Sequence, residues 1–179
     1  RLGGLLTDLA ANRSATLSVD GRLELKVGQV YPGTGIFASI NAGSRISIER
    51  NGDAALPLSA AGTLNLNAPT IVQNGVVRAP FGSITMTASD SITLGGNSVT
   101  SVSGDGLILP YSVLSNNEFW VDPTVKRVDG VPVPTLSKLP EKNIVLQGPE
   151  VMLAAGSVVD IRGGGDPDGW EHVPGPGGS

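Results

Sequence analysis

The chain repeats one short pattern, a glycine followed by alternating apolar and polar residues, at intervals close to 20 residues. Five glycines mark the pattern: Gly21, Gly43, Gly62, Gly82 and Gly104. Alternation with a period of two is typical of a β-strand with one buried face, and self-similarity near 20 residues is typical of a stacked solenoid. A single short strand buries too little apolar surface to offset its ordering entropy, whereas stacked copies share a core and ladder hydrogen bonds.

The pattern is clearest from Gly62 to Leu94, where nearly the same unit is written twice. Aligning the units on their glycines predicts which residues stack. The expected inward columns are Leu23, Ile46, Leu64 and Ile84, and beside them Leu25, Ile48, Leu66 and Met86; the expected outward column is Glu24, Ser47, Asn65 and Thr85. Glycine is expected at the corners because it adopts a positive φ without steric cost.

The sequence therefore predicts an all-β fold, a right-handed parallel β-helix (β-solenoid) with an extra-helical excursion. We expect coils over residues 1–109, the excursion over 110–142, resumed coils over 143–165 and a Gly/Pro-rich tail over 166–179. The excursion has its own composition, with five of the 13 prolines and several aromatic and basic residues. About seven or eight coils at ~4.8 Å each would make a shaft ~35–40 Å long.

Composition excludes several function classes. A net charge of −4 and a pI near 4.9 argue against nucleic acid, because no basic patch is present to meet phosphates. The absence of cysteine excludes disulfides and thiolate metal sites. No apolar run approaches the ~20 residues of a membrane helix. Charged residues are only 16% of the chain, so we expect a surface of Ser, Thr and Asn. Separately, we expect the chain to be a segment of a longer protein.

Three stretches carry a resemblance to a known family: LNAPTIVQNGVVRAPFGSITMTA, SVSGDGLILPYS and VVDIRGGGDPDGWEHVPGPGGS. They resemble filamentous haemagglutinin-type exoproteins, the secreted partners of two-partner secretion systems in Gram-negative bacteria. The resemblance implies a parallel β-helix, export through an outer-membrane transporter pore, and a location that is secreted or on the cell surface. It also implies attachment to a host cell-surface glycan or protein receptor, and it supplies no catalytic residue.

Four aromatic residues outside the coils are candidate ligand contacts: Tyr111, Phe119, Trp120 and Trp170. Exposed on a groove, they would bind sugars by stacking; otherwise they pack the excursion and tail onto the coils. Asp166 and Asp168 could bind calcium, but they lack the context of known calcium repeats, so a solvated turn is the expectation.

A catalytic function would need two or three carboxylates, or a carboxylate and an arginine, on one face. Asp53, Asp90 and Asp105 stand at different offsets from the coil glycines, so they are not expected to form a column. Residues of the excursion (Glu118, Asp122, Lys126 and Arg127) are expected to form surface salt bridges, and His172 is expected to be a tail residue. We therefore expect no catalytic residue, no cofactor and no metal site.

These observations predict a non-enzymatic structural shaft segment of a large secreted adhesin. Two alternatives stay open: a glycan-binding module that uses the excursion aromatics, and a β-helical polysaccharide-degrading enzyme. An exposed aromatic pair beside a groove would favour the first. A carboxylate pair within about 5–10 Å in a cleft would favour the second.

Overall fold

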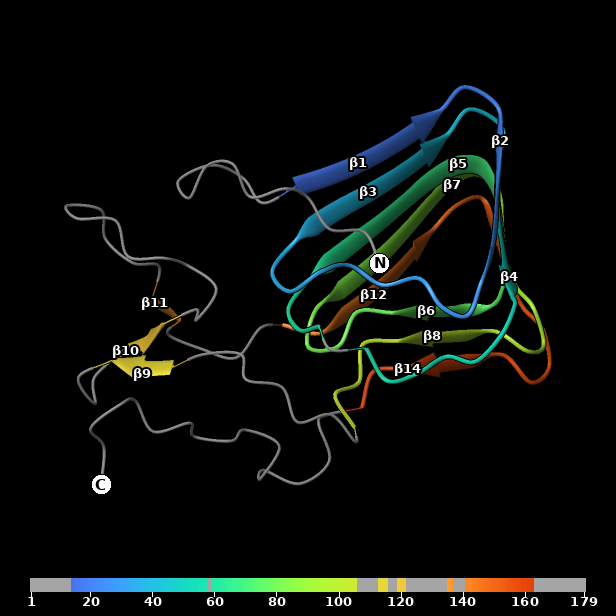
Figure 1. Cartoon of the computed structure of the whole chain (residues 1–179). Helices are drawn as coiled ribbons and strands as arrows, with labels where there is room; N and C mark the ends of the chain where they lie inside the picture. Colours follow the sequence, from blue (N-terminus) through green and yellow to red (C-terminus); the bar gives the residue numbers. More distant parts are fainter. Residues whose placement is uncertain are drawn as a thin grey trace.

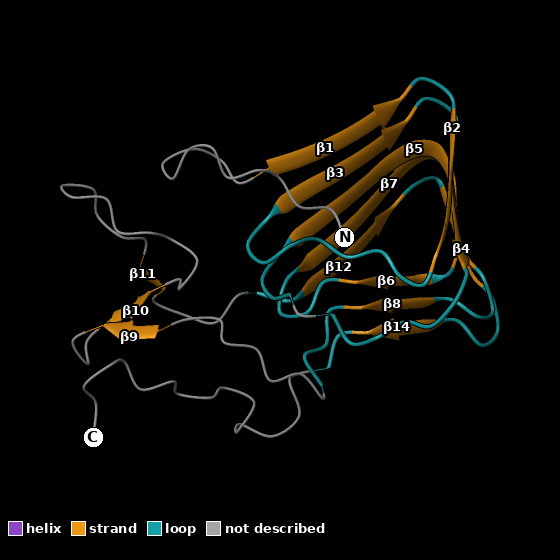
Figure 2. Cartoon of the chain, viewed as in Figure 1, coloured by secondary structure: helices purple, strands orange, loops and turns teal. Residues whose placement is uncertain are grey.

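The structure, a computed structural model, is all-β: parallel strands stack into a β-solenoid of about four turns (Figure 1). It describes residues 14–57, 59–105 and 141–162, together with the backbone of three short strands between residues 106 and 140. Strands and loops account for all of the described residues, and none of them is helical (Figure 2). Among them we find no helix with the length and apolarity that a membrane crossing needs.

Five layers stack along the solenoid axis and share three faces. The first face holds β1 (Ser14–Val19), β3 (Phe37–Ala42), the first half of β5 (Thr63–Asn74), the first half of β7 (Ser83–Leu94) and β12 (Asn143–Gln147). The second face holds β2 (Arg22–Val27), β4 (Arg45–Arg50), the second halves of β5 and β7, and β13 (Glu150–Leu153). The third face holds β6 (Val76–Arg78), β8 (Val99–Ser101) and β14 (Val158–Asp160).

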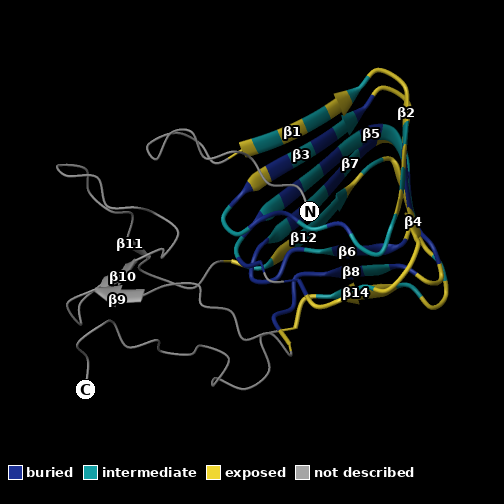
Figure 3. Ribbon diagram, viewed as in Figure 1, coloured by how far each residue is buried: buried dark blue, intermediate teal, exposed yellow. Residues whose placement is uncertain are grey.

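Apolar side chains of successive layers pile up inside the coil. On the first face Ile40, Leu66 and Met86 occupy one column and are at most 1% exposed. On the second face Ile46, Ile71 and Ile92 form a column in which all three are fully buried. The burial pattern along the middle layers follows the alternation in the sequence (Figure 3), so the prediction of which residues point inward is confirmed.

The predicted stacking of those inward residues is wrong between the second and third layers. Ile46 lies beside Ile71, and Leu64 lies beside Ala38. The reason is that the marker glycines occupy different corners. Gly21 and Gly43 join the first face to the second, whereas Gly62 and Gly82 join the third face to the first. Aligning all the units on their glycines therefore placed residues of the second face, such as Ile46, in one column with residues of the first face, such as Leu64.

Three of the marker glycines, Gly43, Gly62 and Gly82, are required for close packing and not for a positive φ, whereas a Cβ on Gly21 would meet no atom within 4 Å. A Cβ on Gly82 would overlap the carbonyl oxygen of Gly62 in the layer before it. The positive φ angles at this corner belong instead to Ala61 (55°) and Phe81 (51°). The predicted role of glycine is therefore wrong at these corners, because the layers approach too closely there for a side chain.

The third face is incomplete at its N-terminal end. After β4 the chain leaves the stack in an exposed loop, so the second layer has no strand on this face. Val30, from the first layer, fills the place: it pairs in parallel with Val77 of β6. Gln29 Nε2 donates a hydrogen bond to the carbonyl oxygen of Ala55 (2.5 Å) and holds the loop against the first layer.

The number of coils is smaller than predicted. Successive layers are 23, 26 and 20 residues apart, as the pairs Ser14–Phe37, Phe37–Thr63 and Thr63–Ser83 show. The fifth layer begins only at Asn143, which pairs with Ser83. Between these layers β9 (Val113–Ser115), β10 (Phe119–Val121) and β11 (Thr135–Leu136) form an antiparallel sheet of their own. The described strands of this segment pair with one another and with no strand of the stack.

Candidate functional site

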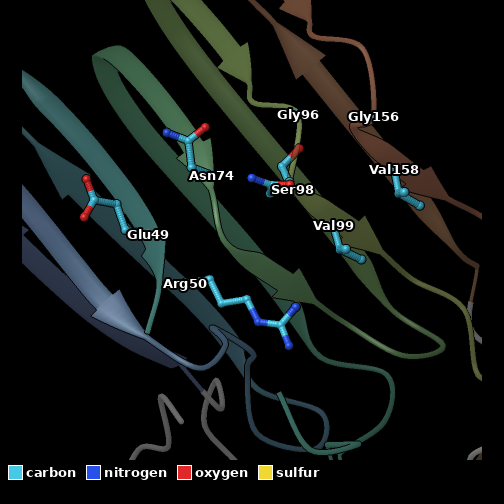
Figure 4. Close-up of a pocket in the computed structure, with 9 residues that line it drawn as sticks. Glu49, Arg50, Asn74, Gly96, Ser98, Val99, Gly156 and Val158 are labelled. Carbon is cyan, nitrogen blue, oxygen red and sulfur yellow. The ribbon is translucent and has the colours of Figure 1, made fainter. Parts of the chain in front are cut away.

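A shallow groove runs across the layers at the corner between the second and third faces (Figure 4). Its volume is about 780 Å³. Four consecutive layers contribute to it, since its lining residues come from the end of β4, the end of β5, the turn before β8 and the turn before β14. They are Glu49, Arg50, Asn74, Gly96, Asn97, Ser98, Val99, Gly156 and Val158.

Unequal corners explain the hollow. In the third layer a single residue, Gly75, separates β5 from β6. In the fourth and fifth layers a turn of four residues separates the corresponding strands. In the second layer the chain departs after Arg50. The corner of the third layer therefore lies closer to the solenoid axis than the corners of the fourth and fifth layers. Because the loop after Arg50 leaves the stack, the groove is open toward the second layer.

A buried glutamine supports the tight corner from inside. Gln73 is fully buried, and its Nε2 donates hydrogen bonds to the carbonyl oxygens of Gly75 (2.9 Å) and Val99 (3.1 Å). It occupies a core position between Ile48 and Leu94. The sequence analysis missed this residue, although a polar residue at an inward position of an alternating strand was the available signal. Buried polar groups with a specified partner fix geometry at a cost in apolar packing.

The groove combines polar groups with an apolar floor. Val99 and Val158 lie in one outward column of the third face. Ser98 is fully buried, and its Oγ has no hydrogen-bond partner among the described residues. Asn74 and Asn97 add side-chain amides, and Arg50 adds a guanidinium. Such a set of donors and acceptors above a small apolar surface suits the hydroxyl groups and ring faces of a sugar.

Charged residues continue the third face beyond the groove. Arg78, Ser101 and Asp160 lie in register on β6, β8 and β14. Burial, and then the nearby positive charge of Arg50, lower the pKa of Arg78, while the Asp160 carboxylate acts in the opposite direction. Arg78 Nη1 is buried and has no hydrogen-bond partner in the part of the chain that the structure describes.

Arg162 holds the other end of this column. Its Nε and Nη2 donate to the two Asp160 carboxylate oxygens at 2.9 and 3.1 Å. The hydrogen bond from Arg162 is the main reason why the pKa of Asp160 is lowered. Asp105 adds a longer ion pair to Arg162 (3.7 Å). Asp105, Asp160 and Arg162 thus pair with one another, and we read these three residues as a clamp between the fourth and fifth layers.

None of the described residues that the sequence offered as candidates lines this groove. The side chains of Phe119 and Trp120, and Tyr111 and Trp170 as a whole, lie outside the described residues, as do Asp166, Asp168, His172 and the charged residues of the excursion. Asp53, Asp90 and Asp105 are all exposed, on a loop, within β7 and after β8 respectively. Among the described residues no group of three or more His, Asp or Glu side chains is placed to hold a metal ion.

Comparisons with protein-family models, with curated proteins and with solved structures returned no match to this chain.

Proposed function

We propose that the chain is a structural shaft segment of a large secreted bacterial adhesin of the filamentous haemagglutinin type. One observation supports it most strongly: apolar columns continue through the stacked layers, and the outward side chains of the first face are mostly small and polar. Asn67 Nδ2 donates to Asn41 Oδ1 (2.8 Å), and Asn41 Nδ2 donates to Ser18 Oγ (3.1 Å), so three layers are linked on the outside as well. Such a stack is stiff along its axis and gives a rigid spacer between a cell and its target.

Export and folding are linked in this proposal. Each layer gains its stability from the layer before it, so folding outside the cell can proceed layer by layer and draw the chain outward through a transporter pore. The partners are then the outer-membrane pore during secretion and a host receptor on the cell surface.

The test places the chain behind a two-partner secretion signal domain, with its cognate pore, and measures export of a C-terminal epitope. Asn65→Pro removes a ladder donor near the start of β5, a strand that is paired on both sides. Ala55→Pro in the exposed loop is the matched control. We expect several-fold less export for Asn65→Pro and unchanged export for the control. Equal export of both variants would show that stacking of the layers plays no part in secretion.

Glycan binding is a second candidate, and the groove favours it. The side-chain amides of Asn74 and Asn97 and the exposed guanidinium of Arg50 line it and can form hydrogen bonds with a ligand. On a broad glycan array we expect binding that falls about tenfold or more with Arg50→Ala. We expect binding to persist with Lys26→Ala, which removes an exposed cation of β2 in the first layer. Loss with Trp120→Ala instead would assign binding to the excursion. A silent array would remove this candidate.

A further inference from the structure

The stack continues directly from the fourth layer to the fifth, although residues 106–140 lie between them in the sequence. β12 pairs in parallel with the first half of β7, β13 pairs with the second half of the same strand, and β14 pairs with β8. The described strands within residues 106–140, which we call the inserted segment, pair with one another. All three faces of the fifth layer therefore rest on the fourth layer itself.

One side chain, that of Phe81, contacts the chain at both ends of the inserted segment. Gly104 precedes the segment, and a Cβ on this glycine would overlap the Phe81 ring, so its backbone lies directly against the ring. Lys142 follows the segment, and its Nζ lies over the same ring, 5.7 Å from the ring centroid. An ammonium group at this distance is attracted to the face of an aromatic ring. Both ends of the inserted segment thus lie at one residue of the stack.

Backbone hydrogen bonds hold the same place from both sides. The N–H of Phe81 donates to the carbonyl oxygen of Val102 (3.1 Å), which comes shortly before Gly104. The N–H of Asn143 donates to the carbonyl oxygen of Gly82 (3.2 Å). The corner formed by Phe81 and Gly82 therefore fixes the chain where it leaves the stack and where it returns.

Ala61 occupies the equivalent corner one layer earlier, and the same two hydrogen bonds form there. Its N–H donates to the carbonyl oxygen of Pro80 (2.9 Å), and the N–H of Ser83 donates to the carbonyl oxygen of Gly62 (3.1 Å). The chain that stacks on Ala61 runs without interruption from Pro80 to Ser83, whereas the chain that stacks on Phe81 is interrupted by the inserted segment. Alanine is therefore sufficient where the stacked chain is continuous.

Phe81 keeps its side chain at a conformational cost. Its φ is 51° and that of Ala61 is 55°, and this left-handed region is unfavourable for a bulky residue. Because alanine adopts the same φ one layer earlier, the backbone of the corner does not require an aromatic side chain. The contacts with Gly104 and Lys142 explain why the ring is present.

We infer that Phe81 fixes both ends of the inserted segment to the fourth layer, and that this corner is an attachment point where the stack can carry a different segment in place of residues 106–140. The inference goes beyond the proposed shaft, because it assigns a place at which the shaft carries another element. It rests on contacts within the stack and is independent of export and of glycan binding. Closing a flexible loop costs only slightly more free energy as the loop lengthens, so a corner that holds both ends accepts segments of different length.

A replacement variant tests the attachment point. Residues 106–140 are replaced by about eight Gly and Ser residues, which reach ~26 Å when extended. We expect the urea midpoint to stay within about 0.5 M of that of the natural chain. We also expect the amides of β12 and β14 to keep their protection in hydrogen exchange. Loss of this protection would show that the stack needs the inserted segment and would overturn the inference.

Phe81→Ala in the full chain tests the role of the ring. We expect amide exchange to become about fivefold faster or more at both ends of the inserted segment, at Gly104 and at Asn143. Phe37→Ala is the matched control, because Phe37 begins β3 and is 60% exposed, and exchange at the two ends should not change. An effect of Phe81→Ala at one end alone, or at neither end, would contradict the inference.

Gly104→Ala is a second variant that leaves Phe81 in place. The added methyl group would displace the Phe81 ring. We therefore expect faster exchange at Asn143, on the far side of the inserted segment, while circular dichroism shows that the fold is kept. Unchanged exchange at Asn143 would show that the ring does not couple the two ends, and the inference would be wrong.

Discussion

Two glycines at equivalent corners should respond in opposite directions to the same substitution. Gly21 and Gly43 both join the first face to the second, in the first and second layers. A Cβ on Gly43 would overlap the carbonyl oxygen of Asp20 in the layer before it, whereas a Cβ on Gly21 would have no atom within 4 Å. Neither residue has a positive φ, so backbone strain contributes nothing to the difference. The contrast follows only from the direction in which the layers stack.

The magnitude follows from two effects. Replacing glycine by alanine restricts the unfolded chain and stabilises the fold by about 0.4–1 kcal/mol where the site accepts a methyl group. Forcing a methyl group into a filled position costs about 1–3 kcal/mol. The first effect is common to both variants, so their free energies of unfolding should differ by about 1–3 kcal/mol. At a denaturant dependence of about 2 kcal/mol/M, the urea midpoints should differ by about 0.5–1.5 M.

Urea unfolding followed by circular dichroism measures the difference. We expect Gly21→Ala to match or exceed the natural chain and Gly43→Ala to fall below it. Gly82→Ala, whose Cβ would overlap the carbonyl oxygen of Gly62, is the companion variant and should resemble Gly43→Ala. Equal midpoints for Gly21→Ala and Gly43→Ala would refute the stacking order.

Two further predictions concern the column of Leu66 and the carboxylate of Asp160. Leu66→Ala should lower the free energy of unfolding by about 2–5 kcal/mol, because Leu66 is fully buried between Ile40 and Met86. Leu17 lies in the same column but in the first layer, where it is only partly buried. Leu17→Ala should therefore lower the free energy of unfolding by less than half as much in the same urea assay. Equal losses for the two variants would contradict the layered packing. Because the pKa of Asp160 is lowered in the fold, its contribution to stability is complete above the ordinary aspartate pKa and is lost as the pH falls through the lowered value, below about pH 4. Arg162→Ala should raise the pKa of Asp160 in an NMR titration, and an unchanged titration would show that Arg162 is not the cause.

The sequence predicted the fold because alternation is a direct record of which side chains are buried. Ile46, Leu64 and Met86 were all assigned inward, and all are fully buried. Coils were expected to resume at residue 143, and the first strand of the last layer, β12, begins at Asn143. Residues of one layer are close in the sequence, so local pattern is sufficient to assign them.

Stacking between layers was harder to predict because a glycine marks a corner without saying which corner. The layers differ in length, and the loop after Arg50 replaces a strand of the third face. These irregularities shift the columns and create the groove at Asn74 and Ser98. The groove depends on the difference between a corner of one residue and a corner of four, and such a difference has no apolar pattern of its own. The role of Gln73 was missed for the same reason, because its side chain supports the short corner at Gly75.

The central claim is the order in which the layers stack, and one pair of double-cysteine variants tests it most directly. In the structure Asn65 is in register with Ser39, whereas alignment on glycines would place it beside Ser47. The full chain with Ser39→Cys and Asn65→Cys should form an intramolecular disulfide under mild oxidation, detected by a mobility shift that reduction reverses. The chain with Ser47→Cys and Asn65→Cys should remain reduced. A disulfide in the second variant and none in the first would contradict the stacking described above.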